Sequence, residues 1–116
     1  LPPEAISRDP GVVAAYVADP LVTKGKVPAR TAAELVLAAS AYPARAPDMR
    51  LPILIQHGAE DVPVPPKANA ALYELIGSPD KTIKIYDELY HEIYNEPERA
   101  AVIDDLMAWL AAHPAG

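Results

Sequence analysis

A short run of consecutive aliphatic residues, Ile53 to Ile55, constrains the fold of this chain more than any other feature. The run is bounded by Pro52 and Gly58. An uninterrupted aliphatic run of this kind is typical of a strand that is buried on both faces of a parallel sheet. We therefore predict a strand over residues 51–57, and this strand needs a neighbour on each side.

The residues that follow predict a helix, a second strand and a last helix. Two prolines at 65–66 can begin a helix with apolar residues at helical spacing, and Gly77 is placed to end it in a left-handed conformation. Apolar and polar residues alternate over 82–86, which indicates a strand nearer the edge of the sheet. The last helix is predicted over about 97–112, where an apolar stripe follows a proline.

The N-terminal third predicts two helices joined by a loop. Asp-Pro pairs at 9–10 and 19–20 can begin and end a short helix. Residues 21–28 have the composition of a loop. The Thr-x-x-Glu spacing at residues 31–34 is typical of a capping box, and it predicts a helix over 32–42 that stops before the next proline.

This order of elements indicates an α/β fold with a parallel sheet and flanking helices, because consecutive parallel strands are joined by a crossover. The apolar fraction of 51% predicts a folded chain. Only two strands are predicted, however, and a two-stranded sheet is marginal. We expect the chain, which begins with Leu1 and not Met, to be the C-terminal part of a larger sheet or to acquire strands from another chain.

The charge and composition exclude several classes of function. The 10 Lys and Arg residues against 16 Asp and Glu residues give a net charge of −6, which argues against nucleic acid as a partner. The absence of cysteine excludes a disulfide framework, a thiolate zinc site and a cysteine nucleophile. No apolar stretch is long enough to predict a membrane span. The acidic residues near the C-terminus are expected to form mostly a solvated face: Glu92, Glu96, Glu98, Asp104 and Asp105. Glu96 and Glu98 are placed to interact with the positive end of the last helix.

Candidate catalytic groups follow the two predicted strands. Asp61 and Glu60 lie in the first loop and His91 in the second. Functional groups of parallel sheets lie at the carboxyl ends of strands, and the 30 residues between Asp61 and His91 suffice for one helix and one strand. A buried carboxylate beside an imidazole can make the general base that a hydroxyl nucleophile needs. On spacing alone, Asp61 could instead be a turn residue and His91 a surface histidine.

The other two histidines are not predicted to be catalytic. We expect His57 to be a structural residue beside Gly58, and His113 to be solvated in the C-terminal tail. A zinc-peptidase motif at His91 fails, because Asn95 occupies the position of the second metal-binding histidine. No metal and no other cofactor is predicted.

Two loops resemble those of a known enzyme superfamily. Residues 56–66, Gln-His-Gly-Ala-Glu-Asp-Val-Pro-Val-Pro-Pro, resemble the acid-bearing turn of α/β-hydrolases, and residues 90–97 are similar to their histidine loop. The closer resemblance is to bacterial monoacylglycerol lipases. It extends over further segments, at residues 6–10, 15–16, 19–22, 78–82 and 108–110.

The resemblance implies roles for these residues and for the parts of the chain. Asp61 would be the triad acid and His91 the general base, in the chain order Ser, Asp, His. Residues 1–28 would be the end of the cap, or lid, and residues 29–116 the C-terminal part of the hydrolase core. The implied activity is hydrolysis of monoacylglycerols or other small carboxylic esters.

The nucleophile is the point at which the sequence departs from this family. The family's serine lies in a G-x-S-x-G elbow, and none of the three serines, Ser7, Ser40 and Ser78, has such neighbours. We therefore expect an N-terminal portion of the same protein to carry the nucleophile, and the chain by itself to be inactive.

Four residues are predicted to contact substrate. The resemblance suggests that Tyr16 contacts the glycerol headgroup, with packing within the lid as the alternative. Val62 and Val64, on either side of Pro63, could line an acyl channel or pack within their loop. Tyr94, three residues after the histidine, could border the alcohol site.

The sequence is also compatible with other functions. The chain could be an inactive fragment or a binding module that associates with itself as a homo-oligomer through its exposed strand edge. The same fold could also serve an esterase, lysophospholipase, thioesterase or peptidase. Peripheral lipid contact through the lid is compatible with a soluble protein, whether cytoplasmic or membrane-associated.

Overall fold

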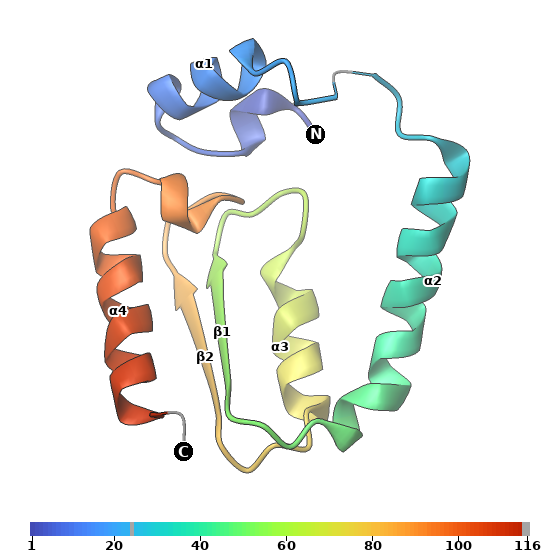
Figure 1. The fold of residues 1–116 in the computed structure, drawn as a ribbon, viewed down its shortest axis with the longest axis vertical. Coiled ribbons are helices and arrows are strands. Elements are labelled where there is room, and N and C mark those ends of the chain that lie inside the picture. The colour runs from blue at the N-terminus through green and yellow to red at the C-terminus, as the bar shows by residue number, and fades with distance from the viewer. Residues whose placement is uncertain (24, 115–116) are drawn as a thin grey trace.

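The chain folds around a parallel two-stranded sheet. The computed structural model describes residues 1–23 and 25–114. Strand β1 (Ile53–Gly58) pairs with strand β2 (Lys81–Tyr86) in parallel, with Ile53 opposite Lys81 and Gly58 opposite Tyr86. Helix α3 (Pro66–Leu75) connects the two strands, and Figure 1 shows this crossover. The predicted strand, helix, strand order and the α/β class are confirmed.

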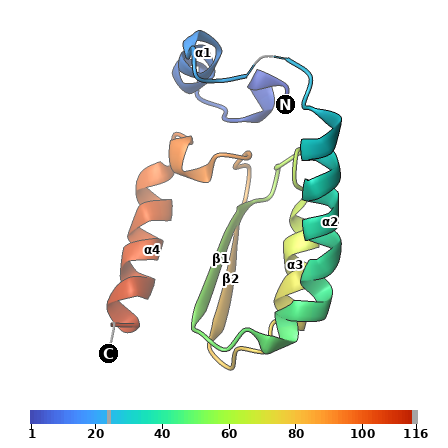
Figure 2. The same cartoon turned by 45° about the vertical axis from the view of Figure 1, so that its right-hand side comes forward.

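Helices lie on both sides of the sheet. Figure 2 shows helix α4 (Arg99–Ala112) on one side, and helices α3 and α2 (Ala29–Arg45) on the other. The aliphatic residues of β1 are nevertheless only half-buried. In the part of the chain that the structure describes, β2 is the only strand beside β1. One edge of β1 is therefore uncovered by these residues, as the strand count predicted.

Helix α1 (Pro10–Ala18) begins and ends where the Asp-Pro pairs predict. The Asp9 carboxylate accepts a hydrogen bond from the Gly11 amide at 2.8 Å, and Pro10 is the first helical residue. In Figure 1, α1 lies beyond the carboxyl ends of both strands. This position puts it on the side of the sheet where the candidate catalytic loops emerge.

Helix α2 differs from its prediction at both ends. It begins at Ala29, where Pro28 precedes the first residue, and no side chain caps it, so the capping box is wrong. It also runs through Pro43 to Arg45. A proline in the last turn removes only one backbone hydrogen bond, and a short 3-10 turn, η2 (Ala46–Asp48), follows directly.

Gly77 does not form the predicted left-handed cap of α3. Its φ is not positive, and α3 ends instead with Ile76 in an extended conformation. A Cβ atom at Gly77 would lie 2.0 Å from the Pro47 carbonyl oxygen. The glycine is needed because two backbone segments approach closely, and its carbonyl accepts a hydrogen bond from Arg50 at 2.7 Å.

Two polar residues near the C-terminus, Glu96 and His113, differ from their predictions. Helix α4 begins at Arg99 and not at Pro97, because Glu96 is extended and fully buried, which removes it from the predicted solvated face. His113 is not solvated either. Its side chain is 22% exposed, stacks on Trp109 with 4.0 Å between ring centroids, and contacts Asp80.

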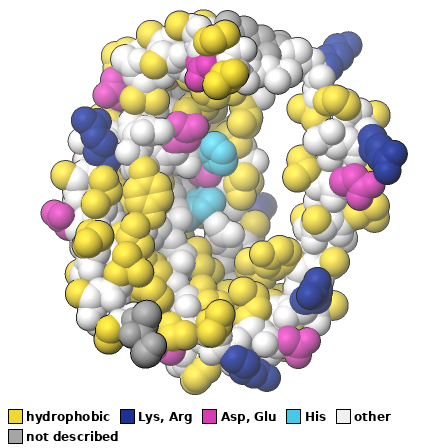
Figure 3. Space-filling model, viewed as in Figure 1, with side chains coloured by type: hydrophobic (Ala, Val, Ile, Leu, Met, Phe, Trp, Pro, Cys, Tyr) yellow, Lys and Arg dark blue, Asp and Glu magenta, His cyan; other side chains and the backbone are white. Residues whose placement is uncertain are grey.

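Much apolar surface is uncovered in the described residues. The buried cluster beside the sheet is small and contains Leu89, Ile93 and Val102. On α2, by contrast, Leu35, Val36 and Leu37 are each 64% exposed. Figure 3 shows hydrophobic side chains on this helix, at the right, and over α4, at the left. None of the described helices is both long and apolar enough to cross a bilayer.

Candidate active site

The two candidate loops are bonded together where the strands end. The amide of Ala59 donates to the Tyr86 carbonyl at 2.8 Å, and the amide of Glu60 donates to the Leu89 carbonyl at 3.0 Å. A Cβ atom at Gly58 would lie 2.3 Å from the Leu89 oxygen. Glycine at this position therefore lets the turn after β1 lie directly against the loop after β2.

Asp61 and His91 meet across these loops. The Asp61 Oδ2 atom lies 2.9 Å from His91 Nδ1, and the Asp61 carboxylate is buried while the His91 side chain is 31% exposed. A buried carboxylate that accepts from Nδ1 holds the ring in one tautomer and favours the imidazolium. The free ring nitrogen, Nε2, is then the one that can take up a proton.

Asp61 also acts as a turn residue. Its Oδ1 atom accepts a hydrogen bond from the Val64 amide at 2.8 Å, which is the local bond expected of an aspartate after a strand. The two interpretations of Asp61 are thus compatible, since each carboxylate oxygen has its own partner. The neighbouring carboxylate, Glu60, is exposed.

His57 supports the same carboxylate, which the sequence did not reveal. Its Nε2 lies 3.1 Å from Asp61 Oδ2 and 2.7 Å from the Val64 carbonyl, and its Nδ1 accepts from the Asn69 side chain at 2.5 Å. These partners favour the neutral tautomer with hydrogen on Nε2. The spacing of four residues between His57 and Asp61, within one turn, is the signal that could have indicated this contact.

Tyr16 borders a small hollow next to the histidine loop. The hollow, of about 290 Å³, lies between α1 and the residues that follow His91. Its polar lining includes Tyr16, Asp19, Glu92 and Asn95. The structure therefore brings Tyr16 close to the loop of His91.

The other predicted contact residues are arranged differently. Val62 is 75% exposed and Val64 is also exposed, so neither lines an enclosed channel within the described residues. Tyr94 is exposed, and its hydroxyl donates to the Gln56 side chain at 2.6 Å. Gln56 in turn bonds to the hydroxyl of Tyr86, whose pKa is raised to about 12 by burial.

Each of the three serine hydroxyls is engaged by a backbone carbonyl. Ser7 donates to Asn95 at 3.0 Å, Ser40 to Val36 at 2.7 Å, and Ser78 to Asp80 at 3.0 Å. None of these bonds involves His91. Within residues 1–23 and 25–114, moreover, no group of His, Asp and Glu side chains could hold a metal ion.

The chain is similar in sequence and in structure to known hydrolases. The family described as serine aminopeptidase, S33, matches residues 1–98. A monoacylglycerol lipase of Mycolicibacterium smegmatis is 43% identical over 110 residues, which are 95% of this chain and 39% of that protein.

Two solved structures extend the comparison. The monoacylglycerol lipase of Paleococcus ferrophilus has a TM-score of 0.81 and 30% identity, and the match covers 98% of this chain and 44% of that one. A soluble variant of the Saccharomyces cerevisiae monoglyceride lipase, solved with a substrate analog, has a TM-score of 0.89 at 21% identity, covering 100% and 41%. The second likeness bears on the fold alone.

These matches confirm the resemblance of the sequence to bacterial monoacylglycerol lipases. The chain spans about two fifths of the length of the Mycolicibacterium smegmatis relative. Its parallel sheet and flanking helices correspond to part of the lipase structures. The chain belongs to the serine aminopeptidase S33 family of α/β-hydrolases.

Proposed function

We propose that this chain supplies the acid and the base of a serine-hydrolase triad that cleaves monoacylglycerol esters. The contact of 2.9 Å between Asp61 and His91, at the carboxyl ends of adjacent parallel strands, carries the proposal. The 43% identity to a monoacylglycerol lipase supports the class of substrate. Asp61 would be the triad acid and His91 the general base.

The proposed reaction has two steps. His91 Nε2 takes the proton of the serine hydroxyl while the serine oxygen attacks the ester carbonyl, and Asp61 stabilises the resulting imidazolium. The imidazolium then gives the proton to the departing glycerol oxygen, which leaves an acyl-serine. His91 then takes a proton from a water molecule that attacks this second ester, and the imidazolium returns that proton to the serine oxygen as the fatty acid leaves.

The nucleophile would come from a segment with a G-x-S-x-G elbow that adds strands beside β1. Two observations support this partner. One edge of β1 has no strand among the described residues, and the apolar side chains of α2 are uncovered. In the assembled protein, residues 1–28 would form the end of the lid and residues 29–116 part of the core.

The substrate contacts belong to the same proposal. Tyr16 would reach the glycerol headgroup from the hollow beside the histidine loop. Val62 and Val64 would line the acyl channel once the partner segment covers them. Tyr94 would border the alcohol site with its ring, because its hydroxyl is already bonded to Gln56.

The test uses a chimera in which this chain replaces the matching region of the Mycolicibacterium smegmatis lipase, called the lipase chimera below. The rest of that lipase would supply the nucleophile elbow. We expect the lipase chimera to hydrolyse monoacylglycerol and to react with a fluorophosphonate probe. The isolated chain of 12.4 kDa should not be labelled.

Other results would contradict parts of the proposal. Labelling of the isolated chain would mean that one of its own serines is activated. A folded lipase chimera that is labelled but prefers a lysophospholipid, an acyl thioester or a peptide would overturn the substrate class. A folded lipase chimera without labelling would overturn the assignment of the acid and base.

A further inference from the structure

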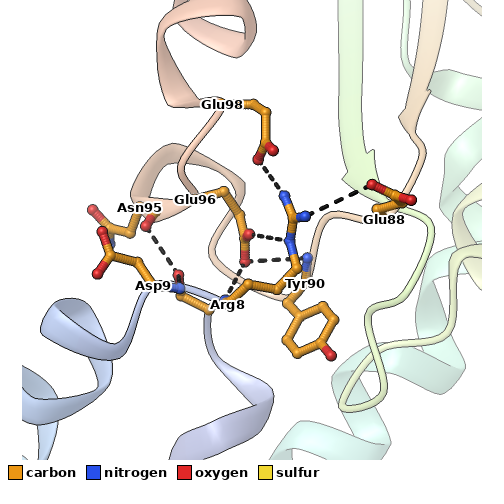
Figure 4. A network of polar contacts seen from close by, with 8 residues as sticks. Arg8, Asp9, Glu88, Tyr90, Asn95, Glu96 and Glu98 are labelled. Atoms are coloured by element: carbon orange, nitrogen blue, oxygen red, sulfur yellow. Dashed lines mark hydrogen bonds and ion pairs between the residues drawn. The ribbon is translucent and has the colours of Figure 1, made fainter.

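We propose that Glu96, paired with Arg8, is a positioning residue that holds the backbone of His91. This inference rests on the proposed function of His91 as the general base. Figure 4 shows the Glu96 carboxylate between the segment that precedes α1 and the histidine loop. Neither residue touches the reacting atoms in the proposed mechanism, so their effect would pass through His91.

Glu96 is a buried charge with a complete set of partners. Its side chain is 0% exposed, and a carboxylate in such a place is costly unless it is paired and hydrogen-bonded. Its Oε2 accepts from Arg8 Nε at 2.8 Å, and its Oε1 accepts from the Arg8 backbone amide at 3.0 Å. One residue thus binds both carboxylate oxygens, which fixes the orientation of the carboxylate.

The same carboxylate reaches the residue before His91. Glu96 Oε1 also accepts from the backbone amide of Tyr90, at 3.3 Å. On the other side of the histidine, the backbone amide of Glu92 donates to the Ile6 carbonyl at 2.9 Å. The amides of both residues that flank His91 are therefore held by residues 6–8, directly or through Glu96.

Arg8 binds the histidine loop at three acidic positions. Besides Glu96, its guanidinium pairs with Glu98 and lies 3.8 Å from Glu88. These carboxylates come from both ends of the loop that carries His91. The hydrogen bond to Glu96 raises the pKa of Arg8 above its ordinary value, so the cation persists at any working pH.

Two carboxylates therefore share the positioning of His91. Asp61 orients the ring through Nδ1, while Glu96 holds the Leu89–Tyr90 peptide group, one residue before the histidine. A shift of about 1 Å at a catalytic group can cost about 100-fold in rate. Loss of the Glu96 charge should therefore affect turnover more than substrate binding.

The test is the Glu96→Gln variant of the lipase chimera, with Glu34→Gln as the matched control. Glu34 is exposed on α2, and its pair with Arg30 at 3.9 Å is remote from the histidine loop in the chain. We expect Glu96→Gln to lower kcat about 10- to 100-fold with less than about threefold change in KM. The control should change neither value.

Two further measurements separate positioning from stability alone. In Glu96→Gln, kcat should fall even when it is expressed per active site titrated with the fluorophosphonate probe, because misplacement of His91 slows each site, whereas unfolding only removes sites. The amides of Tyr90 and Glu92 should also exchange hydrogen faster than in the Glu34→Gln control. A folded Glu96→Gln variant with unchanged kcat per active site and unchanged amide exchange would overturn the proposal, even with a lower Tm.

A milder variant covers the case in which Glu96→Gln does not fold. Arg8→Lys keeps the charge and the backbone amide but loses the guanidinium geometry, so we expect about a threefold to tenfold loss of kcat at similar Tm. Unchanged kcat would overturn the proposal. If the unsubstituted lipase chimera is inactive, the proposed function fails, but amide exchange still tests the positioning role of Glu96. Faster exchange at Tyr90 and Glu92 in the variant would support that role, and unchanged exchange would overturn it.

Discussion

At the scale of single residues, the Asp61 carboxylate is contacted by two histidine side chains from different parts of the chain. His57, at the end of β1, lies 3.1 Å from Oδ2, and His91, after β2, lies 2.9 Å from the same atom. The Val64 amide binds the other oxygen. These three contacts hold the buried carboxylate in place beside His91, which is the arrangement that the proposed mechanism needs.

The first residue prediction concerns Asp61→Asn. An amide cannot hold the His91 ring in the required tautomer, so kcat of the lipase chimera should fall by about 10⁴-fold with little change in Tm. Glu60→Gln is the matched control, because Glu60 is the exposed neighbour in the same turn. Steady-state kinetics and thermal unfolding test both variants, and near-normal turnover of Asp61→Asn would refute the assignment.

The second residue prediction concerns pH and His113. Its pKa is raised above 6.5, chiefly by the hydrogen bond to the Trp109 carbonyl and also by Asp80. A raised pKa means that the added stability is present below about pH 6.5 and is lost as pH rises through the folded-state value. The difference in Tm between the natural chain and His113→Gln should therefore shrink from about pH 5.5 to about pH 8.5.

Thermal unfolding of both proteins at low salt measures this difference. Asp80→Asn supplies the control, because it removes a charged partner of His113 and should weaken the pH dependence. The same difference in Tm at every pH would contradict the prediction.

At the scale of elements, the end of β1 and the histidine loop act as one packed unit. Their contact depends on Gly58, where a Cβ atom would meet the carbonyl oxygens of both Leu89 and Tyr90 at 2.3 Å. The segment that leads from β2 into this loop contains Glu88 with a φ of 65°, a left-handed conformation that is uncommon outside glycine. Local backbone geometry and close packing therefore both determine where His91 lies.

The element prediction is that Gly58→Ala displaces the histidine loop. The new methyl group would meet backbone atoms of Leu89 and Tyr90, which no side-chain rotation can move, so we expect a loss of about 1–3 kcal/mol in the free energy of unfolding. Gly25→Ala is the control, since nothing lies within 4 Å of its Cβ position. Equal denaturant midpoints for the two variants would contradict the expected displacement.

At the scale of the whole molecule, the described residues leave apolar surface that a stable domain would cover. The sheet has two strands, and three consecutive large apolar residues on α2 are mostly exposed. A hollow of about 580 Å³ separates α2 from α3 and is lined mainly by apolar side chains of both helices. Exposed apolar area on this scale marks a surface for association.

The corresponding prediction compares the isolated chain with the lipase chimera. The isolated chain should bind the dye ANS strongly, because its apolar helix faces are open to solvent. In the lipase chimera, the added segment should cover these faces and reduce dye fluorescence per molecule. Equal fluorescence, measured at equal concentration in folded samples, would mean that the segment does not cover α2.

Local patterns in the sequence determined three of the elements and one contact at the candidate site. The aliphatic run at 53–55, the alternation at 82–86 and the Asp-Pro pair before α1 each depend on nearest neighbours, and all three elements form as predicted. The meeting of Asp61 and His91 followed from the same information. Parallel strands joined by one helix must end at the same edge of the sheet, so their following loops are adjacent.

Only the tertiary structure decided the features that depend on residues far apart in the chain. Glu96 and Arg8 are separated by 88 positions, and no local pattern shows that the carboxylate is buried beside a guanidinium. The close approach at Gly77 and the contact of His113 with Asp80 have the same origin. Propensity and spacing act over a few residues, whereas burial and charge pairing are set by segments that meet only when the chain folds.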